Sequence, residues 1–140
     1  MIFEFDEGTF EIPGAWADQT ENKLARSAGD GSSYAFTIFR ARPPDGQSLA
    51  AFVDENLAVQ AQTTRGFELL TRREITLAGS PAVEVESRWL HEDKFVFQCM
   101  AVAPYHDRVL VVTAASRMKL SESCRDLMRR VLPTLELRER

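Results

Sequence analysis

Three segments of the chain are apolar over most of their length and barely alternate between apolar and polar residues. They are residues 34–39, 95–102 and 109–115. A sheet that faces water on one side alternates with a period of two, so strands of this kind need cover on both faces. Clear alternation is found instead in residues 2–12, where Glu7 and Gly8 suit a tight turn between two short strands.

Apolar residues at helical spacing occur in two other stretches. Ser48 follows a proline-rich turn and can cap a helix that Gly66 ends. The apolar stripe of this helix consists of Leu49, Phe52, Val53, Leu57 and Val59. A second helix begins at or just before Ser121 and ends at Pro133.

The rest of the chain reads as a series of strands joined by turns. Strands are predicted over residues 20–26, 33–42, 67–78, 82–90, 94–103 and 108–116. The predicted fold class is therefore α+β, a single domain over residues 1–140 in which a curved antiparallel sheet of six to seven strands carries two helices on one face. Each helix is only ~18–25 Å long, so the second face must curl on itself or meet another chain.

Composition narrows the class of protein. The 140 residues are 44% hydrophobic and 27% charged, as in globular domains, and the net charge of −4 argues against nucleic acid and anionic membranes as partners. No stretch approaches the ~18 apolar residues of a membrane span, so no direct membrane insertion is expected. The first residues, MIFEFDEG, lack the features of a secretory signal, and Cys99 and Cys124 lie in apolar patterns that favour buried free thiols. These features predict a cytoplasmic protein.

Catalytic signatures are weak. His91 and His106 lie in predicted turns beside carboxylates, where a metal or acid–base pair would be one interpretation. Neither histidine has the spacing of a metal motif, and solvated turn residues account for both. The sequence has no glycine-rich phosphate loop, and Ser80 in the segment AGSP is a turn residue. We therefore expect no enzyme activity and no cofactor.

Three ordered segments carry a family resemblance. They read EGTFEIPGAWADQTENKL, SYAFTIFRARPPDGQSL and GFELLTRREITLAGSPAVEVESRWL. Over residues 7–132 the chain resembles the DcrB-like family, in a superfamily shared with PsbP-like proteins, and within it the Eag chaperones of type VI secretion effectors. Because no signal sequence is seen, the cytoplasmic Eag branch fits better than an exported DcrB-like protein.

The resemblance implies a non-catalytic homodimeric chaperone. Its partner would be the hydrophobic N-terminal segment of a secreted effector, namely the transmembrane helices of a PAAR-containing protein, often an Rhs toxin. An exposed helix of ~20 apolar residues aggregates in water, and a curved apolar sheet face could shield it. The alternative is a DcrB-like or PsbP-like scaffold or assembly factor that binds no membrane helix.

Strand parity sorts the residues that could line such a face. In the strand at 33–40, Tyr34, Phe36 and Ile38 alternate with Ala35, Thr37 and Phe39, and the set with Thr37 suits close approach of a helix. Gln98, amid apolar neighbours, is either an edge-strand residue facing water or, as the resemblance implies, an amide donor to a bound helix. The candidate client-binding residues are Leu24, Ala35, Thr37, Phe39, Gln60, Ser87, Val96, Gln98 and Met100.

Overall fold

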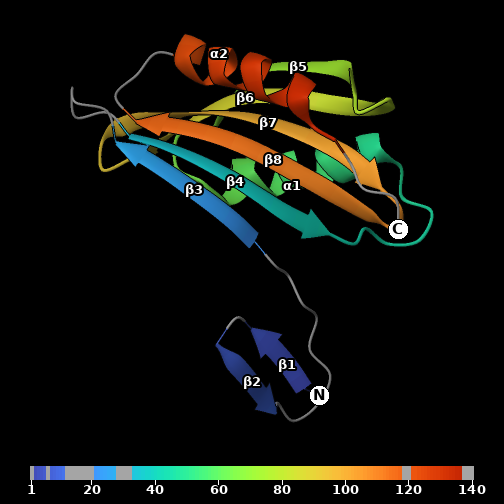
Figure 1. The fold of residues 1–140 in the computed structure, drawn as a ribbon. Helices are drawn as coiled ribbons and strands as arrows, with labels where there is room; N and C mark the ends of the chain where they lie inside the picture. Colours follow the sequence, from blue (N-terminus) through green and yellow to red (C-terminus); the bar gives the residue numbers. More distant parts are fainter. Residues whose placement is uncertain (1, 6, 12–20, 28–32, 118–120, 137–140) are drawn as a thin grey trace.

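The computed structural model describes residues 2–5, 7–11, 21–27, 33–117 and 121–136. Within these residues the chain forms a two-stranded hairpin and a six-stranded sheet with two α-helices (Figure 1). The hairpin pairs β1 (Ile2–Phe5) with β2 (Gly8–Glu11). The α+β class, the antiparallel sheet and the two helices predicted from the sequence are confirmed.

The larger sheet has the strand order β3-β4-β8-β7-β6-β5, and every neighbouring pair is antiparallel. The strands are β3 (Glu21–Ser27), β4 (Ser33–Ala41), β5 (Glu68–Leu77), β6 (Ser80–His91), β7 (Lys94–Tyr105) and β8 (Arg108–Arg117). Strands β5 to β8 are joined by two-residue turns, and their first turn residues, Ala78, Glu92 and His106, have positive φ. Such turns match the right-handed twist of paired strands.

The two helices begin and end close to where the sequence predicts. α1 (Leu49–Thr63) is capped by Ser48, whose Oγ accepts a hydrogen bond from the backbone N–H of Ala51 at 3.1 Å. α2 (Ser121–Val131) runs into a short 3₁₀ turn, η1 (Leu132–Thr134), at Pro133. None of the helices in the described part of the chain is long and apolar enough to cross a membrane.

The helices lie on opposite faces of the sheet, not together on one face as predicted (Figure 1). On β7, Ala101 belongs to the cluster that packs under α2, whereas its neighbour Val102 belongs to the cluster under α1. Successive residues of a strand point to opposite faces, so the two clusters are separated by the sheet. Strands that are apolar on both faces require cover on both, and one helix serves each face.

An ion pair between Arg125 and Glu86 holds α2 on its face of the sheet. Arg125 of α2 donates through Nε and Nη2 to the two carboxylate oxygens of Glu86 on β6, both at 2.7 Å. Only 6% of the Glu86 side chain is exposed. The hydrogen bonds from Arg125 are the main reason that the pKa of Glu86 is lowered, against the opposing effect of burial. Nearby, Arg73 of β5 pairs with buried Glu84 of β6, and its Nε and Nη2 lie 2.9 and 2.6 Å from the same carboxylate oxygen, Oε1.

Several smaller predictions can be checked in the described residues. Cys99 is buried, as expected, and forms no disulfide within the described part of the chain, while the side chain of Cys124 lies outside that part. His91 and His106 are exposed residues at the ends of the β6–β7 and β7–β8 turns. His106 is therefore a turn residue, as predicted, whereas His91 is the last residue of β6, paired with Lys94 directly before the turn.

Candidate functional site

The sheet face that carries α1, here called the α1 face, is built from cross-strand rows of aligned residues. One row runs from Ala35 on β4 through Ala115 on β8 and Gln98 on β7 to Ser87 on β6. The next row runs through Thr37, Thr113, Met100 and Val85. Residues paired across antiparallel strands point to the same side, so both rows lie on the α1 face.

α1 covers only part of this face. Its buried residue Val53 packs in a cluster with Val83, Val85, Met100, Val102, Val109 and Val111. Phe39 and the helix residues Leu49, Phe52 and Leu57 pack against the same cluster. These contacts lie over β6, β7 and one end of β8. The other end of the face, toward β3 and β4, is therefore not covered by α1.

Five half-buried residues form this remaining part of the α1 face, here called the open band. They are Ala35, Thr37, Gln98, Thr113 and Ala115. The band is uncharged, its side chains are small except for one amide, and it offers two hydroxyls. Small residues allow a helix to approach the sheet closely, and hydroxyl and amide groups can hydrogen-bond across the contact. The band is suited to holding an apolar helix and offers no acid, base or nucleophile pair for catalysis.

The residues predicted from strand parity are brought together. Seven of the nine candidates lie in strands on the α1 face, namely Ala35, Thr37, Phe39, Ser87, Val96, Gln98 and Met100. Gln60 is half-buried in the helical stripe of α1 that also contains Val53 and Leu57, so it lies on the sheet side of that helix. Leu24 is the exception, because it pairs with Phe36 and therefore belongs to the opposite face.

Burial divides this set further. Ser87, Val96 and Met100 are buried, and Met100 lies in the cluster under α1. They can support the band but have little surface left to offer a partner. Thr113 and Ala115 are the two band residues that strand parity missed. Residues 108–116 follow a tight turn from 94–103, and aligning these two segments across that turn would have found both.

Gln98 does not lie at an edge of the sheet. Its strand, β7, is flanked by β6 and β8, so the interpretation of Gln98 as an edge-strand residue is wrong. The residue is half-buried between Ala115 and Ser87 in its row. A central half-buried amide with small neighbours is available to a ligand lying on the band and is shielded from bulk water on its strand sides.

Exposed apolar side chains extend the site toward β5. Leu69 is the cross-strand partner of Ser87 and is 45% exposed, so it continues the row of Ala35, Ala115 and Gln98. Val59 on α1 is 54% exposed. On the sheet, exposed Leu69 at β5 therefore adds apolar surface to the row that also contains part of the open band.

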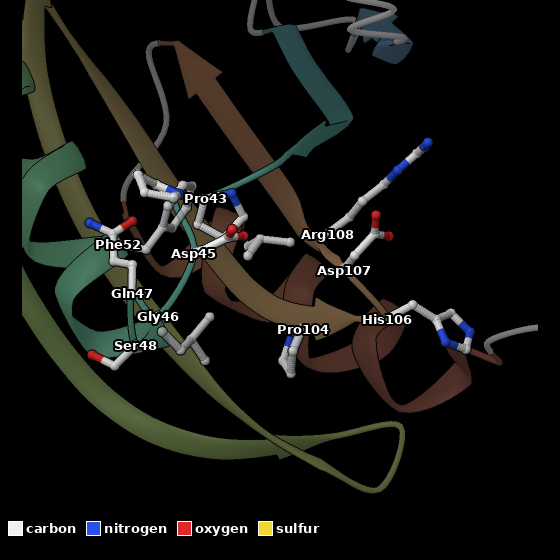
Figure 2. Close-up of a pocket in the computed structure, with 13 residues that line it drawn as sticks. Pro43, Asp45, Gly46, Gln47, Ser48, Phe52, Pro104, His106, Asp107 and Arg108 are labelled. Carbon is white, nitrogen blue, oxygen red and sulfur yellow. The ribbon is translucent and has the colours of Figure 1, made fainter.

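A separate pocket of about 280 Å³ lies at one end of the sheet (Figure 2). The β4–α1 loop and the β7–β8 turn line it, with Pro43, Pro104 and Phe52 as apolar walls. Arg42 pairs with Asp107 at 3.0 Å at its rim, and Figure 2 shows His106 directed away from the other labelled residues. Its polar lining residues include Asp45, Gln47 and Ser48, and none of the residues predicted from strand parity lines it, so the open band is the site developed below.

Fold and site together define a class: an α+β domain whose antiparallel sheet offers an uncharged, partly covered apolar face. The comparison with protein families agrees with this class. The DcrB family model matches residues 7–134, and the chain belongs to the DcrB family.

Two individual proteins are similar over most of the chain. The Pseudomonas aeruginosa protein called Effector EagT6 is 28% identical over 114 residues, which is 80% of this chain and 78% of that protein. The crystal structure of PA94, a Pseudomonas aeruginosa protein of unknown function, superposes with a TM-score of 0.79 at 23% identity. This match covers 100% of this chain and 98% of PA94, and it shows that the two share a fold.

A weaker likeness is found to the PsbP protein of Synechocystis, CyanoP. Its solution structure matches with a TM-score of 0.47 and 12% identity, over 91% of this chain and 94% of that one.

Proposed function

We propose that this chain is a non-catalytic chaperone for a secreted effector protein. In the cytoplasm it binds the N-terminal transmembrane helices of a PAAR- or Rhs-type effector of type VI secretion and shields them from water until the effector is loaded for export. The working unit is a homodimer, and each open band receives apolar helix surface. Similarity to Effector EagT6 supports the link to effectors, as does membership of the DcrB family, within which the sequence resembles Eag chaperones.

The single observation that carries the proposal is the open band on the α1 face. Ala35, Thr37, Thr113 and Ala115 form an uncharged floor of small residues that α1 leaves half-buried. The row from Ala35 to Leu69 crosses five neighbouring strands, β4, β8, β7, β6 and β5, and strands ~4.8 Å apart make it ~19 Å long. A client helix that lies along this row, beside α1, would rest on the sheet over about three turns.

The expected affinity is useful but reversible. Contact of ~600–800 Å² of apolar surface at ~25 cal/mol per Å² gives a gross gain of roughly 15–20 kcal/mol. Loss of translational freedom and ordering of the helix cost much of this gain. Reversibility is required because the effector has to leave the chaperone when it is exported.

Co-expression with the apolar N-terminal fragment of an effector tests the proposal. The fragment should stay in solution and co-purify with the wild-type chain. Ala115→Arg, which places a charge in the open band, should abolish capture, whereas Ala58→Arg on the exposed side of α1 should not. A fragment that is equally soluble without this chain, or capture that Ala115→Arg leaves unchanged, would contradict the proposal and favour a scaffold with no membrane-helix client.

A further inference from the structure

The pocket of Figure 2 is lined on one side by residues whose hydrogen-bond donors are absent or already used. Pro43, Pro44 and Pro104 belong to its lining, and proline has no backbone N–H. The backbone N–H of Gln47 donates to the oxygen of Pro44 at 3.1 Å, and its Nε2 donates to Oε2 of Glu55 at 2.7 Å. A ligand that binds on this side therefore has to bring donors of its own.

The amide of Gln47 leaves an acceptor at this pocket. Because Nε2 lies against the carboxylate of Glu55, a flipped amide would set two oxygens against each other, so Oε1 is the atom that remains. Oε1 is buried and receives no hydrogen bond from the described residues. A buried acceptor without a donor costs free energy, and a ligand around which the β4–α1 loop adjusts would recover it.

Asp45 adds a negative charge that a ligand reaches without any adjustment, because this residue is exposed. Figure 2 shows Asp45 and Gln47 on one side of the pocket and the side chains of His106 and Arg108 directed away from them. The arginine at the rim, Arg42, is already paired with a carboxylate. The side that carries Asp45 therefore favours a cation over an anion.

We propose that this pocket binds a lysine or arginine side chain. Ammonium and guanidinium groups carry donors and no acceptors, as the lining requires, and their apolar stems can lie along Pro43, Phe52 and Pro104. The volume of about 280 Å³ has room for a side chain and not only for a single water, whose share of liquid volume is ~30 Å³.

The source of this side chain is the client, and in naming it the inference rests on the proposed function. Lys and Arg commonly flank transmembrane segments. The pocket opens on the same face as the open band, since Phe52 and Val109 line it and pack in the cluster under α1. Val109 and Thr113 are four residues apart on β8, or ~13 Å, which about four extended residues of a client can span.

Titration of the full chain with Nα-acetyl-arginine amide, followed by the NMR signals of Gly46 and Val109, tests the pocket without any effector. The same compound of citrulline, a neutral analogue of arginine, is the control ligand and should shift neither signal. Asp45→Asn should raise the dissociation constant about tenfold, and Gln47→Met should raise it as well. Glu74→Gln, which removes an exposed carboxylate on β5, is the matched control variant and should leave it unchanged.

Three results would overturn the pocket: no shift with the arginine compound, equal shifts with the citrulline compound, or a dissociation constant that neither Asp45→Asn nor Gln47→Met raises. Both substitutions lie in an exposed loop, and an unchanged circular dichroism spectrum confirms that each variant is folded.

A second titration, with the apolar N-terminal fragment of an effector, tests the source of the side chain. Replacing the basic residues that flank its apolar segment by serine should raise the dissociation constant about tenfold for the wild type and leave it unchanged for Asp45→Asn. An equal increase for both proteins would overturn the client as the source. Ala115→Arg should abolish capture of the fragment and still bind the arginine compound, so a failure of the pocket and a failure of the proposed function are separate outcomes.

Discussion

Replacing Arg125 by glutamine should lower the free energy of unfolding, because the buried carboxylate of Glu86 loses its charged partner. Glu86 is 6% exposed and accepts two hydrogen bonds of 2.7 Å from Arg125, which is itself 33% exposed. Removing one partner of a fully buried pair costs about 3–5 kcal/mol. Here the arginine is partly solvated and Thr71 also hydrogen-bonds to Glu86, so we expect the free energy of unfolding to fall by about 2–3 kcal/mol.

The assay is urea unfolding at pH 7, followed by circular dichroism. Arg65→Gln is the control, because it removes the same side chain from the pair of Arg65 with Asp93, where the two side chains are 73% and 84% exposed. That surface pair should contribute less than about 0.5 kcal/mol. If both substitutions lowered the free energy of unfolding equally, the Arg125–Glu86 pair would not be what holds α2 on the sheet.

At acidic pH the wild type and Arg125→Gln should have the same free energy of unfolding. The pKa of Glu86 is lower in the folded protein than its ordinary value of 4.5, so the pair contributes stability that is fully present above that value. The contribution is lost as the pH falls through the folded pKa, when the carboxylate takes up its proton. A difference that stays constant from pH 7 to pH 3 would contradict this linkage.

Three further substitutions test the backbone and the core. Ala78→Asn should raise the free energy of unfolding by about 0.5–1 kcal/mol in thermal or urea unfolding, because Ala78 has a φ of 49° and precedes a glycine in a two-residue hairpin turn. Gly66→Ala should lower it by more than Gly46→Ala: both glycines have positive φ, but an added Cβ at Gly66 would lie 2.8 Å from Cγ of Leu90 and at Gly46 would meet nothing within 4 Å. Met128→Ala should lower it by about 2–4 kcal/mol, since this side chain of α2 is 1% exposed in the core; a loss below 1 kcal/mol would mean that α2 is not firmly packed.

The sequence was sufficient to predict the strands and the sharing of one face by most candidate residues. A strand must alternate its side chains, so once residues 33–41 and 94–105 are strands, the parity of Thr37 and Gln98 is fixed. The same rule applied to β3 depends on its register. Leu24 pairs with Phe36, and an alignment shifted by one residue would have placed it on the other face.

Long-range placement could not be read from local patterns. The choice of face by each helix depends on how its connecting loops cross the sheet, and two helices of suitable length satisfy the hydrophobic pattern in either arrangement. Arg125 and Glu86 are 39 residues apart and meet only because α2 lies over β6 and its neighbours. What the sequence did contain was the requirement for cover on both faces, since residues 95–102 and 109–115 are apolar on both sides.

Site-specific photo-crosslinking is the most direct test of the claim that the open band holds a hydrophobic helix. A photoreactive side chain at Thr37, in the band, and one at Ala58, on the exposed side of α1, would be compared in complexes with the apolar N-terminal fragment of an effector. The account predicts a crosslink to the apolar segment from position 37 and none from position 58. Equal labelling from both positions, or none from position 37 while the fragment remains bound, would contradict it.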